Sequence, residues 1–175
     1  VMRSLLALFA CTLCLSAAEV TPVTWSGAIN VPDPVAVTVD EKGAVYVCAT
    51  TRRKVGDLDI REHMQWVADD VGLTSPLEKE AFYKRVMAPG VLLGPRGSVK
   101  DHNGDGSVDW KDLSFHKERI YKIVDTDGNG VADKITLFAE GFNAVGAGIA
   151  AGILYHDGWV YVTAQPDLWR LKDTD

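Results

Sequence analysis

A repeat with an offset of 48 residues constrains the fold of this chain more than any other feature of its sequence. Residues 119–127 match residues 167–175 in their alternation of side chains and in the Asp-Thr-Asp that closes both segments. A hairpin pattern precedes each segment, at residues 35–49 and 152–164, and each hairpin contains Val-Tyr-Val. A fixed period of this size is typical of proteins assembled from one repeated supersecondary unit.

Each unit supplies a hairpin, a third strand and an Asp-rich turn, and residues 134–138 give the first unit a fourth strand. Four-stranded antiparallel sheets repeated around an axis form a β-propeller. We therefore predict a mainly β fold, with a first propeller blade over about residues 35–138 and part of a second over about residues 149–175. On this prediction residues 19–175 are the N-terminal part of a propeller domain, and the propeller is incomplete.

Residues 51–117 form an insertion in the first blade, where the second blade has only Gln165–Asp167. Apolar residues at helical spacing predict a helix early in the insertion: Ile60, Met64, Val67 and Val71. Ser75–Glu78 is a capping box with proline at the first helical position, and Pro89–Gly90 ends the helix that it starts. A further short helix is predicted from the spacing of Leu113, Lys117 and Ile120.

Two Asp-rich loops carry side-chain oxygens at every second position and glycine at the sixth. This spacing resembles the calcium loop of an EF-hand, because Ca²⁺ takes six to eight oxygen ligands and Gly106 and Gly130 permit the sharp bend. The predicted ligands of the first loop are Asp101, Asn103, Asp105, Asp109 and Asp112, with the carbonyl of Ser107. The predicted ligands of the second loop are Asp125, Asp127, Asn129 and Asp133, with the carbonyl of Val131.

The two loops differ at the twelfth position. In the first loop Asp112 can complete the calcium coordination with a carboxylate. The second loop has Thr136 at this position, so Asp133 at the ninth position must contribute more to the coordination. Carboxylates brought together without a metal repel one another, so we expect calcium to fasten the turns and not to perform chemistry. The alternative is a pair of Asn/Asp/Gly surface turns that hold no metal.

The N-terminus has the pattern of a secretory signal peptide, with Arg3 followed by a short apolar run and by Ser16–Ala18. We predict cleavage after Ala18, a periplasmic or extracellular location, and no transmembrane helix after cleavage. Cys11 and Cys14 lie in the predicted signal peptide, so Cys48 is left without a partner for an intrachain disulfide. Export is consistent with calcium binding, since calcium is abundant outside the cytoplasm.

The charge balance argues against a nucleic-acid partner. The chain has 24 acidic and 18 basic residues, a formal net charge of −6, and loses one more positive charge if Arg3 is removed with the leader. No basic stripe is present. Much of the acidic excess lies in the two loops, where bound ions would neutralise it.

Residues 119–130, 137–143 and 167–175 resemble the bacterial membrane-bound dehydrogenase propellers, which are similar to the glucose/sorbosone dehydrogenases. Residues 59–63 and 101–106 of the insertion also fit this family. The resemblance implies an exported quinoprotein that oxidises a sugar or alcohol with PQQ. It further implies an electron acceptor such as a c-type cytochrome, or haem c in a C-terminal domain. On this view the chain is an N-terminal fragment of a longer protein, and is not expected to be active alone.

The resemblance transfers no catalytic or cofactor-binding residue, so both remain unassigned. Four histidines are candidates for a general base, on the ground of residue type alone: His63, His102, His116 and His156. We expect Arg52 and Arg53 on the solvated surface, although they would suit an anionic cofactor. Trp159 and Trp169 are expected to pack in the core and not to stack on a sugar.

Two other classes of function fit parts of the sequence. The first loop and the residues after it resemble one half of a dockerin, a calcium-dependent docking module, but the pattern after the second loop is that of a strand. A lactonase-type propeller hydrolase would also use calcium.

Overall fold

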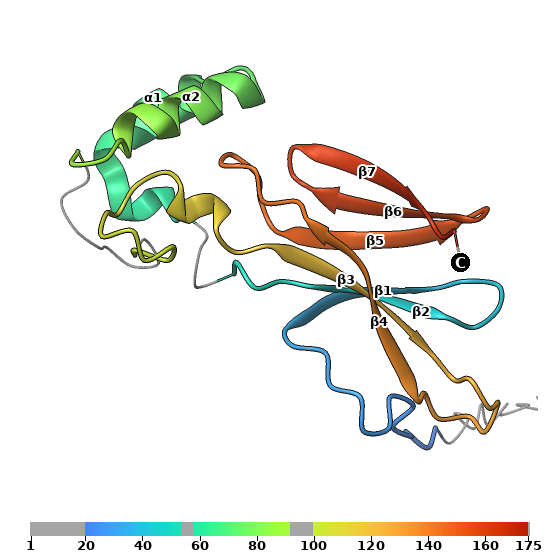
Figure 1. The fold of residues 1–175 in the computed structure, drawn as a ribbon. Coiled ribbons are helices and arrows are strands. Elements are labelled where there is room, and N and C mark those ends of the chain that lie inside the picture. Colours follow the sequence, from blue (N-terminus) through green and yellow to red (C-terminus); the bar gives the residue numbers. More distant parts are fainter. Residues whose placement is uncertain (1–19, 54–57, 92–99, 175) are drawn as a thin grey trace, which may run out of the picture.

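The computed structural model describes residues 20–53, 58–91 and 100–174. It shows a mainly β protein of two antiparallel sheets, with a helical region beyond one end of the strands (Figure 1). The predicted signal peptide, residues 1–18, lies outside the described residues. Of the helices in the described ranges, none has the length and apolar character needed to cross a bilayer.

The first sheet has four strands in the order β1 (Pro34–Val39), β2 (Val45–Ala49), β3 (Glu118–Val124) and β4 (Lys134–Gly141). The predicted hairpin is confirmed. Asp40 stabilises its turn by accepting hydrogen bonds from the amides of Lys42 at 2.9 Å and Ala44 at 2.8 Å. The fourth strand is three residues longer than expected.

The second sheet has three strands in the order β5 (Ala150–His156), β6 (Trp159–Ala164) and β7 (Asp167–Lys172). Asp157 and Gly158 connect β5 to β6 with φ of 50° and 75°, the two positive values that a tight type I′ hairpin requires.

The internal repeat is visible in the strand register. Val47 pairs with Tyr121 in the first sheet, and the equivalent residues Val162 and Trp169 pair in the second. The two units therefore share the register of their second and third strands as well as their sequence.

The core lies between the sheets, which stack with β5 beside β1 and β2 (Figure 1). Its buried residues are Ala44, Tyr46, Cys48 and Ile120 from the first sheet and its turn, and Ala150, Val160, Val162 and Ala164 from the second. A hydrogen bond of 2.9 Å from the amide of Tyr155 to Thr38 Oγ1 joins β5 to β1. The described strands form two stacked sheets and not a closed ring.

The opposite face of the first sheet is covered by the N-terminal segment. Trp25, Ile29 and Val31 pack against Val47 and Ile123. The amide of Ala132, behind the second Asp-rich loop, donates to the carbonyl of Trp25 at 2.8 Å and fixes this segment.

The insertion contains η1 (Ile60–Trp66), α1 (Val67–Gly72), α2 (Pro76–Val86) and the short η2 (Asp112–Ser114). The predicted capping box is present: Ser75 Oγ accepts from the amide of Glu78 at 3.2 Å. Glu78 in return accepts from the amide of Thr74 at 2.7 Å, one residue before the expected partner. The helical region has its own core, formed by Phe82, Tyr83, Met87, Leu113 and Val145.

The helix predicted early in the insertion is present as η1 followed by α1, with an interruption at His63. Its apolar spacing does not mark a buried face, since Met64 and Val71 are 68% and 78% exposed. The short helix predicted near Leu113 is a three-residue 3₁₀ turn, since Ile120 belongs to β3.

The expectation that Trp159 and Trp169 pack in the core is wrong. Trp169 is 42% exposed and contacts Phe142, while Trp159 is half-buried beneath the Arg170 guanidinium, 4.2 Å from its ring centroid.

Candidate functional site

The first candidate calcium loop, residues 101–112, is wrapped around the carboxylate of its first residue. Asp101 accepts hydrogen bonds from the amide of Gly104 at 2.7 Å and from that of Gly106 at 2.9 Å. Gly104 and Gly106 have φ of 73° and 87°, a conformation that a Cβ would strain. The bend expected at Gly106 is therefore confirmed, and a second one occurs at Gly104.

Asp112 joins the end of this loop to its beginning. Its carboxylate accepts from the amides of His102 at 2.8 Å, Asn103 at 3.2 Å and Asp109 at 2.8 Å. The Asp112 side chain is 1% exposed, and its neighbour Leu113 belongs to the core of the helical region. The twelfth position therefore closes the first loop by hydrogen bonding.

The second candidate loop, residues 125–133, has the same backbone arrangement. Asp125 accepts from the amides of Gly128 and Gly130, both at 2.8 Å. Gly128 and Gly130 have φ of 73° and 88°, within a degree of their counterparts in the first loop.

Asp133 closes the second loop in the way that Asp112 closes the first. It accepts from the amide of Thr126 at 3.0 Å and from the Thr126 hydroxyl at 2.6 Å, and Thr126 occupies the second loop position as His102 does. Thr136, the residue at the twelfth position, lies in β4 with its hydroxyl 3.4 Å from the carbonyl of Lys122. The ninth residue thus closes the second loop by hydrogen bonding, and its expected role as a calcium ligand stays a prediction.

In the middle of both loops, a side-chain oxygen accepts a hydrogen bond from the backbone amide two residues further along the chain. Asn103 accepts from the amide of Asp105, and Asp105 accepts from that of Ser107. Asp127 and Asn129 repeat this pattern in the second loop, where Asn129 accepts from the amide of Val131.

These hydrogen bonds favour the ionised state of the loop carboxylates. The hydroxyl and amide of Ser107 lower the pKa of Asp105 to about 2, and the amide of Gly130 lowers the pKa of Asp125. Ser107 also donates to Asp109, which is fully buried. Lys111 lies 3.3 Å from Asp105 and 3.6 Å from Asp109, so it partly offsets the negative charge of the first loop.

In the described parts of the chain, no three His, Cys, Asp or Glu side chains converge into a group that could hold a metal by themselves. The candidate ligand sets combine carboxylates with the amide oxygens of Asn103 and Asn129 and with backbone carbonyls. This mixture of oxygen donors is the type that calcium takes.

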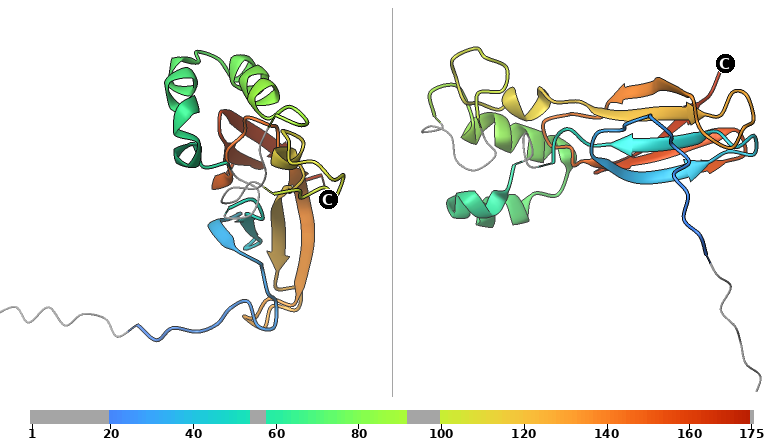
Figure 2. Two further views of the ribbon diagram at one scale, coloured as in Figure 1. Left: turned by 90° about the vertical axis from the view of Figure 1, so that its left-hand side faces the viewer. Right: turned by 90° about the horizontal axis from the view of Figure 1, so that it is seen from below.

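The two loops lie at opposite ends of the strands (Figure 2). The first lies beside the helical region, where the amide of Trp110 donates to the carbonyl of Met87 at 2.9 Å. The second forms the turn between β3 and β4, and its residues 126–131 are exposed. Any metal bound by the loops would therefore stabilise two separate parts of the molecule.

The four histidines do not assemble into one site. His102 and His116 lie together, with 3.1 Å between Nδ1 of His102 and Nε2 of His116, and burial lowers the pKa of His116. His63 is 1% exposed and stacks on Trp66, with 4.1 Å between the ring centroids. His156 ends β5 and is exposed.

The expectation of a surface position for Arg52 is wrong, whereas Arg53 is exposed. Arg52 is 1% exposed and donates to the carbonyls of Gly148 and Leu113, both at 3.2 Å. Glu118, which the sequence analysis did not single out, accepts from the amide of Arg52 and is fully buried. Neither residue lies in a motif that would have revealed its role.

Fold and loops together define a mainly β protein of two repeated, stacked sheets that carries two Asp-rich loops of one conformation. The chain belongs to a family described as a domain of unknown function (DUF7133), whose profile matches residues 27–175. No curated protein and no solved structure matches the chain significantly.

Proposed function

We propose that this protein is a calcium-binding β-propeller scaffold, in which both Asp-rich loops hold structural calcium. One observation carries the proposal: two loops that differ in length and surroundings share the same hydrogen bonds at positions one, two, four and six. Two unrelated surface turns would not need to share these hydrogen bonds. A common requirement to bind the same ligand accounts for the shared pattern, because the bonds turn the carboxylates toward the inside of each loop.

The blade assignment is supported by how the sheets pack. Tyr46 and Cys48 of β2 face the second sheet, and their counterparts Tyr161 and Thr163 lie on its far side. The first sheet therefore packs through one face, and the second sheet packs against it through the opposite face. Consecutive propeller blades stack front to back in this way. The adjacency of β1 and β5, the first strand of each unit, also fits blades arranged around an axis.

A role in sugar or alcohol oxidation is a second proposal, and it rests on the sequence resemblance alone. Arg52, which the sequence analysis considered for an anionic cofactor, is buried and donates to two backbone carbonyls, so it gives this proposal no support. We therefore derive no oxidation step, and no transfer of electrons to a c-type cytochrome, from this chain.

The dockerin alternative is not favoured. A dockerin requires a helix behind each of its two calcium loops, whereas the second loop here is followed directly by strand β4. The structure offers no observation that favours a lactonase.

The calcium proposal is tested by scanning calorimetry of the purified chain with calcium and with EGTA. A ligand that binds only the folded state stabilises it by about 2.7 kcal/mol at 100-fold saturation, so we expect calcium to raise the melting temperature by several degrees. Asp105→Ala and Asp127→Ala should each reduce this shift by removing one loop's site.

Asp69→Ala is the matched control, since Asp69 is an exposed acidic residue of α1 outside both loops. It should keep the whole calcium-dependent shift. If the parent shows no shift, or if Asp105→Ala and Asp127→Ala both keep it, the loops are metal-free turns.

A further inference from the structure

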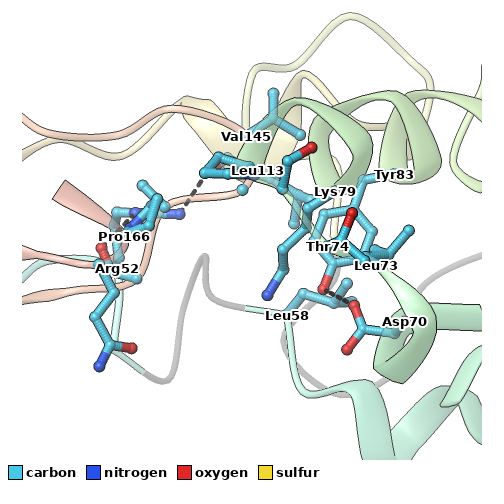
Figure 3. A pocket seen from close by; sticks show the side chains of 16 residues that line it. Arg52, Leu58, Asp70, Leu73, Thr74, Lys79, Tyr83, Leu113, Val145 and Pro166 are labelled. Carbon is cyan, nitrogen blue, oxygen red and sulfur yellow. Dashed lines mark hydrogen bonds between the residues drawn. The ribbon is translucent and has the colours of Figure 1, made fainter.

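A cleft of about 690 Å³ lies between the helical region and the end of the two sheets (Figure 3). One side is formed by α1, α2 and the residues that connect them, and the other by residues 145–148 and 165–166. Arg52 and Leu113 also line it. The volume is in the range of sites that hold small organic ligands, and neither calcium loop contributes a predicted ligand to it.

Lys79 of α2 directs its ammonium group into this cleft (Figure 3). The stem of Lys79 lies against the backbone at Gly146, where an added Cβ would come within 3.5 Å of Lys79 Cγ. The ammonium lies 5.6 Å from the ring centroid of Tyr83. None of the ion pairs found between described residues includes Lys79, so its charge is available to a ligand.

The charge of the cleft favours an anion. Arg52 also lines the cleft and adds positive charge to it, while its guanidinium hydrogen bonds go to the carbonyls of Gly148 and Leu113. Among the described lining residues the one carboxylate is that of Asp70, which accepts a hydrogen bond of 3.2 Å from the Tyr83 hydroxyl (Figure 3). Two cations and one carboxylate give the described part of the lining a net positive charge.

The remaining walls offer apolar surface. Leu58, Leu73 and Val145 line the cleft, with Leu58 near the Lys79 ammonium and Pro166 on the side of the sheets (Figure 3). A small inorganic anion would leave these apolar side chains exposed to water, whereas a ligand with an apolar body would bury them, and this burial would favour binding.

We propose that the cleft binds a small organic anion, whose carboxylate or phosphate group pairs with Lys79 and whose apolar body lies against Leu58, Leu73 and Val145. The proposal goes beyond calcium binding and does not depend on it, because its residues are separate from the predicted calcium ligands.

The test is isothermal titration calorimetry of the purified chain, saturated with calcium, with four probes. Benzoate and phenyl phosphate carry an anionic group on an apolar ring, benzyl alcohol keeps the ring without the charge, and glucose has neither. We expect at least one of the two anions to bind, with a Kd on the order of 1–10 mM, and the two neutral probes to bind at least tenfold more weakly. Binding of benzoate alone identifies a carboxylate ligand, and binding of phenyl phosphate alone a phosphate ligand.

Lys79→Met should weaken binding of the anion by about tenfold, and Lys79→Arg should restore most of it. Lys84→Met is the matched control, since Lys84 lies on the same helix but pairs with Glu80 outside the cleft, and it should bind as the parent does. Anion binding that survives Lys79→Met, equal binding of benzyl alcohol or glucose, or no anion binding would overturn the proposal. The melting temperature of each variant with and without EGTA reports separately on folding and on the calcium loops.

Discussion

Glu118 is the residue that ties the two sheets and the insertion together. One carboxylate oxygen accepts from the Thr50 hydroxyl at 2.9 Å and from the amide of Arg52 at 3.2 Å. The other accepts from the amide of Ala150 at 3.0 Å, where the second sheet begins. All three partners are donors, so an ionised carboxylate satisfies this buried position completely.

Replacing Glu118 with Gln should therefore destabilise the fold by about 1–3 kcal/mol, because the amide NH₂ would face a donor without an acceptor. Urea unfolding followed by circular dichroism measures the change in the free energy of unfolding. Glu140→Gln is the control: Glu140 is exposed on β4 and pairs with Lys117 and Arg119 at the surface, where ion pairs contribute about 0–1 kcal/mol. Equal losses in the two variants would show that Glu118 does not have this role.

The sequence could not show the positions of Glu118 and Arg52, because their partners lie far away along the chain. Ala150 is 32 residues from Glu118, and the two carbonyls that Arg52 contacts are 61 and 96 residues from it. An Arg-Arg pair in a polar stretch has the local pattern of a solvated surface. Only the tertiary arrangement of three segments makes one of the two arginines buried.

At the scale of elements, local signals predicted well and amphipathic spacing predicted poorly. The strands were predictable because β-branched runs flank turns that have their own stabilising residues, such as Asp40. The capping box of α2 was predictable because it joins neighbours in sequence. The spacing of Met64 and Val71 did not predict a buried face because both side chains are exposed to solvent, and the core of the helical region includes Phe82 of α2 and Met87, the residue after it.

The loops were predictable for the same local reason. The hydrogen bonds that the Asp125 and Asp133 carboxylates accept span seven residues or fewer, so local spacing is enough to indicate the turn. Occupancy by a metal depends on the calcium affinity of the loop and on the calcium concentration, and residue spacing determines neither.

The position of the second loop between β3 and β4 gives a prediction for this hairpin. Removing calcium would leave the carboxylates of this loop without a counter-charge, so we expect the turn to loosen. Amide hydrogen exchange read by mass spectrometry should then show β4 losing protection before β2, which is hydrogen-bonded on both sides. Asp127→Ala should exchange at β4 as the EGTA-treated parent does, whereas Asp69→Ala should not. Simultaneous loss of protection in β2 and β4 would instead mean that calcium acts on the whole sheet.

At the scale of the whole molecule, the repeat leaves one face of the second sheet without the cover that the first sheet has. Tyr46 and Cys48 are fully buried beneath the second sheet, whereas the counterpart of Cys48, Thr163, is exposed. Leu154 and Leu168 lie on this same outer face and are 59% and 68% exposed. A sheet face of this composition matches a surface that another repeat would bury.

A purified chain presents this face to other copies of itself, so we expect concentration-dependent self-association through it. The double variant Leu154→Lys, Leu168→Lys should place positive charge on the face. It should shift the chain to monomer in sedimentation velocity. Leu77→Lys is the control, because Leu77 is 78% exposed on α2, away from the sheets, and its replacement should leave association unchanged. Calcium should not alter the result, since neither loop lies on this face. A chain that stays monomeric at high concentration, or a double variant that associates as the parent does, would show that the outer face of the second sheet does not drive association.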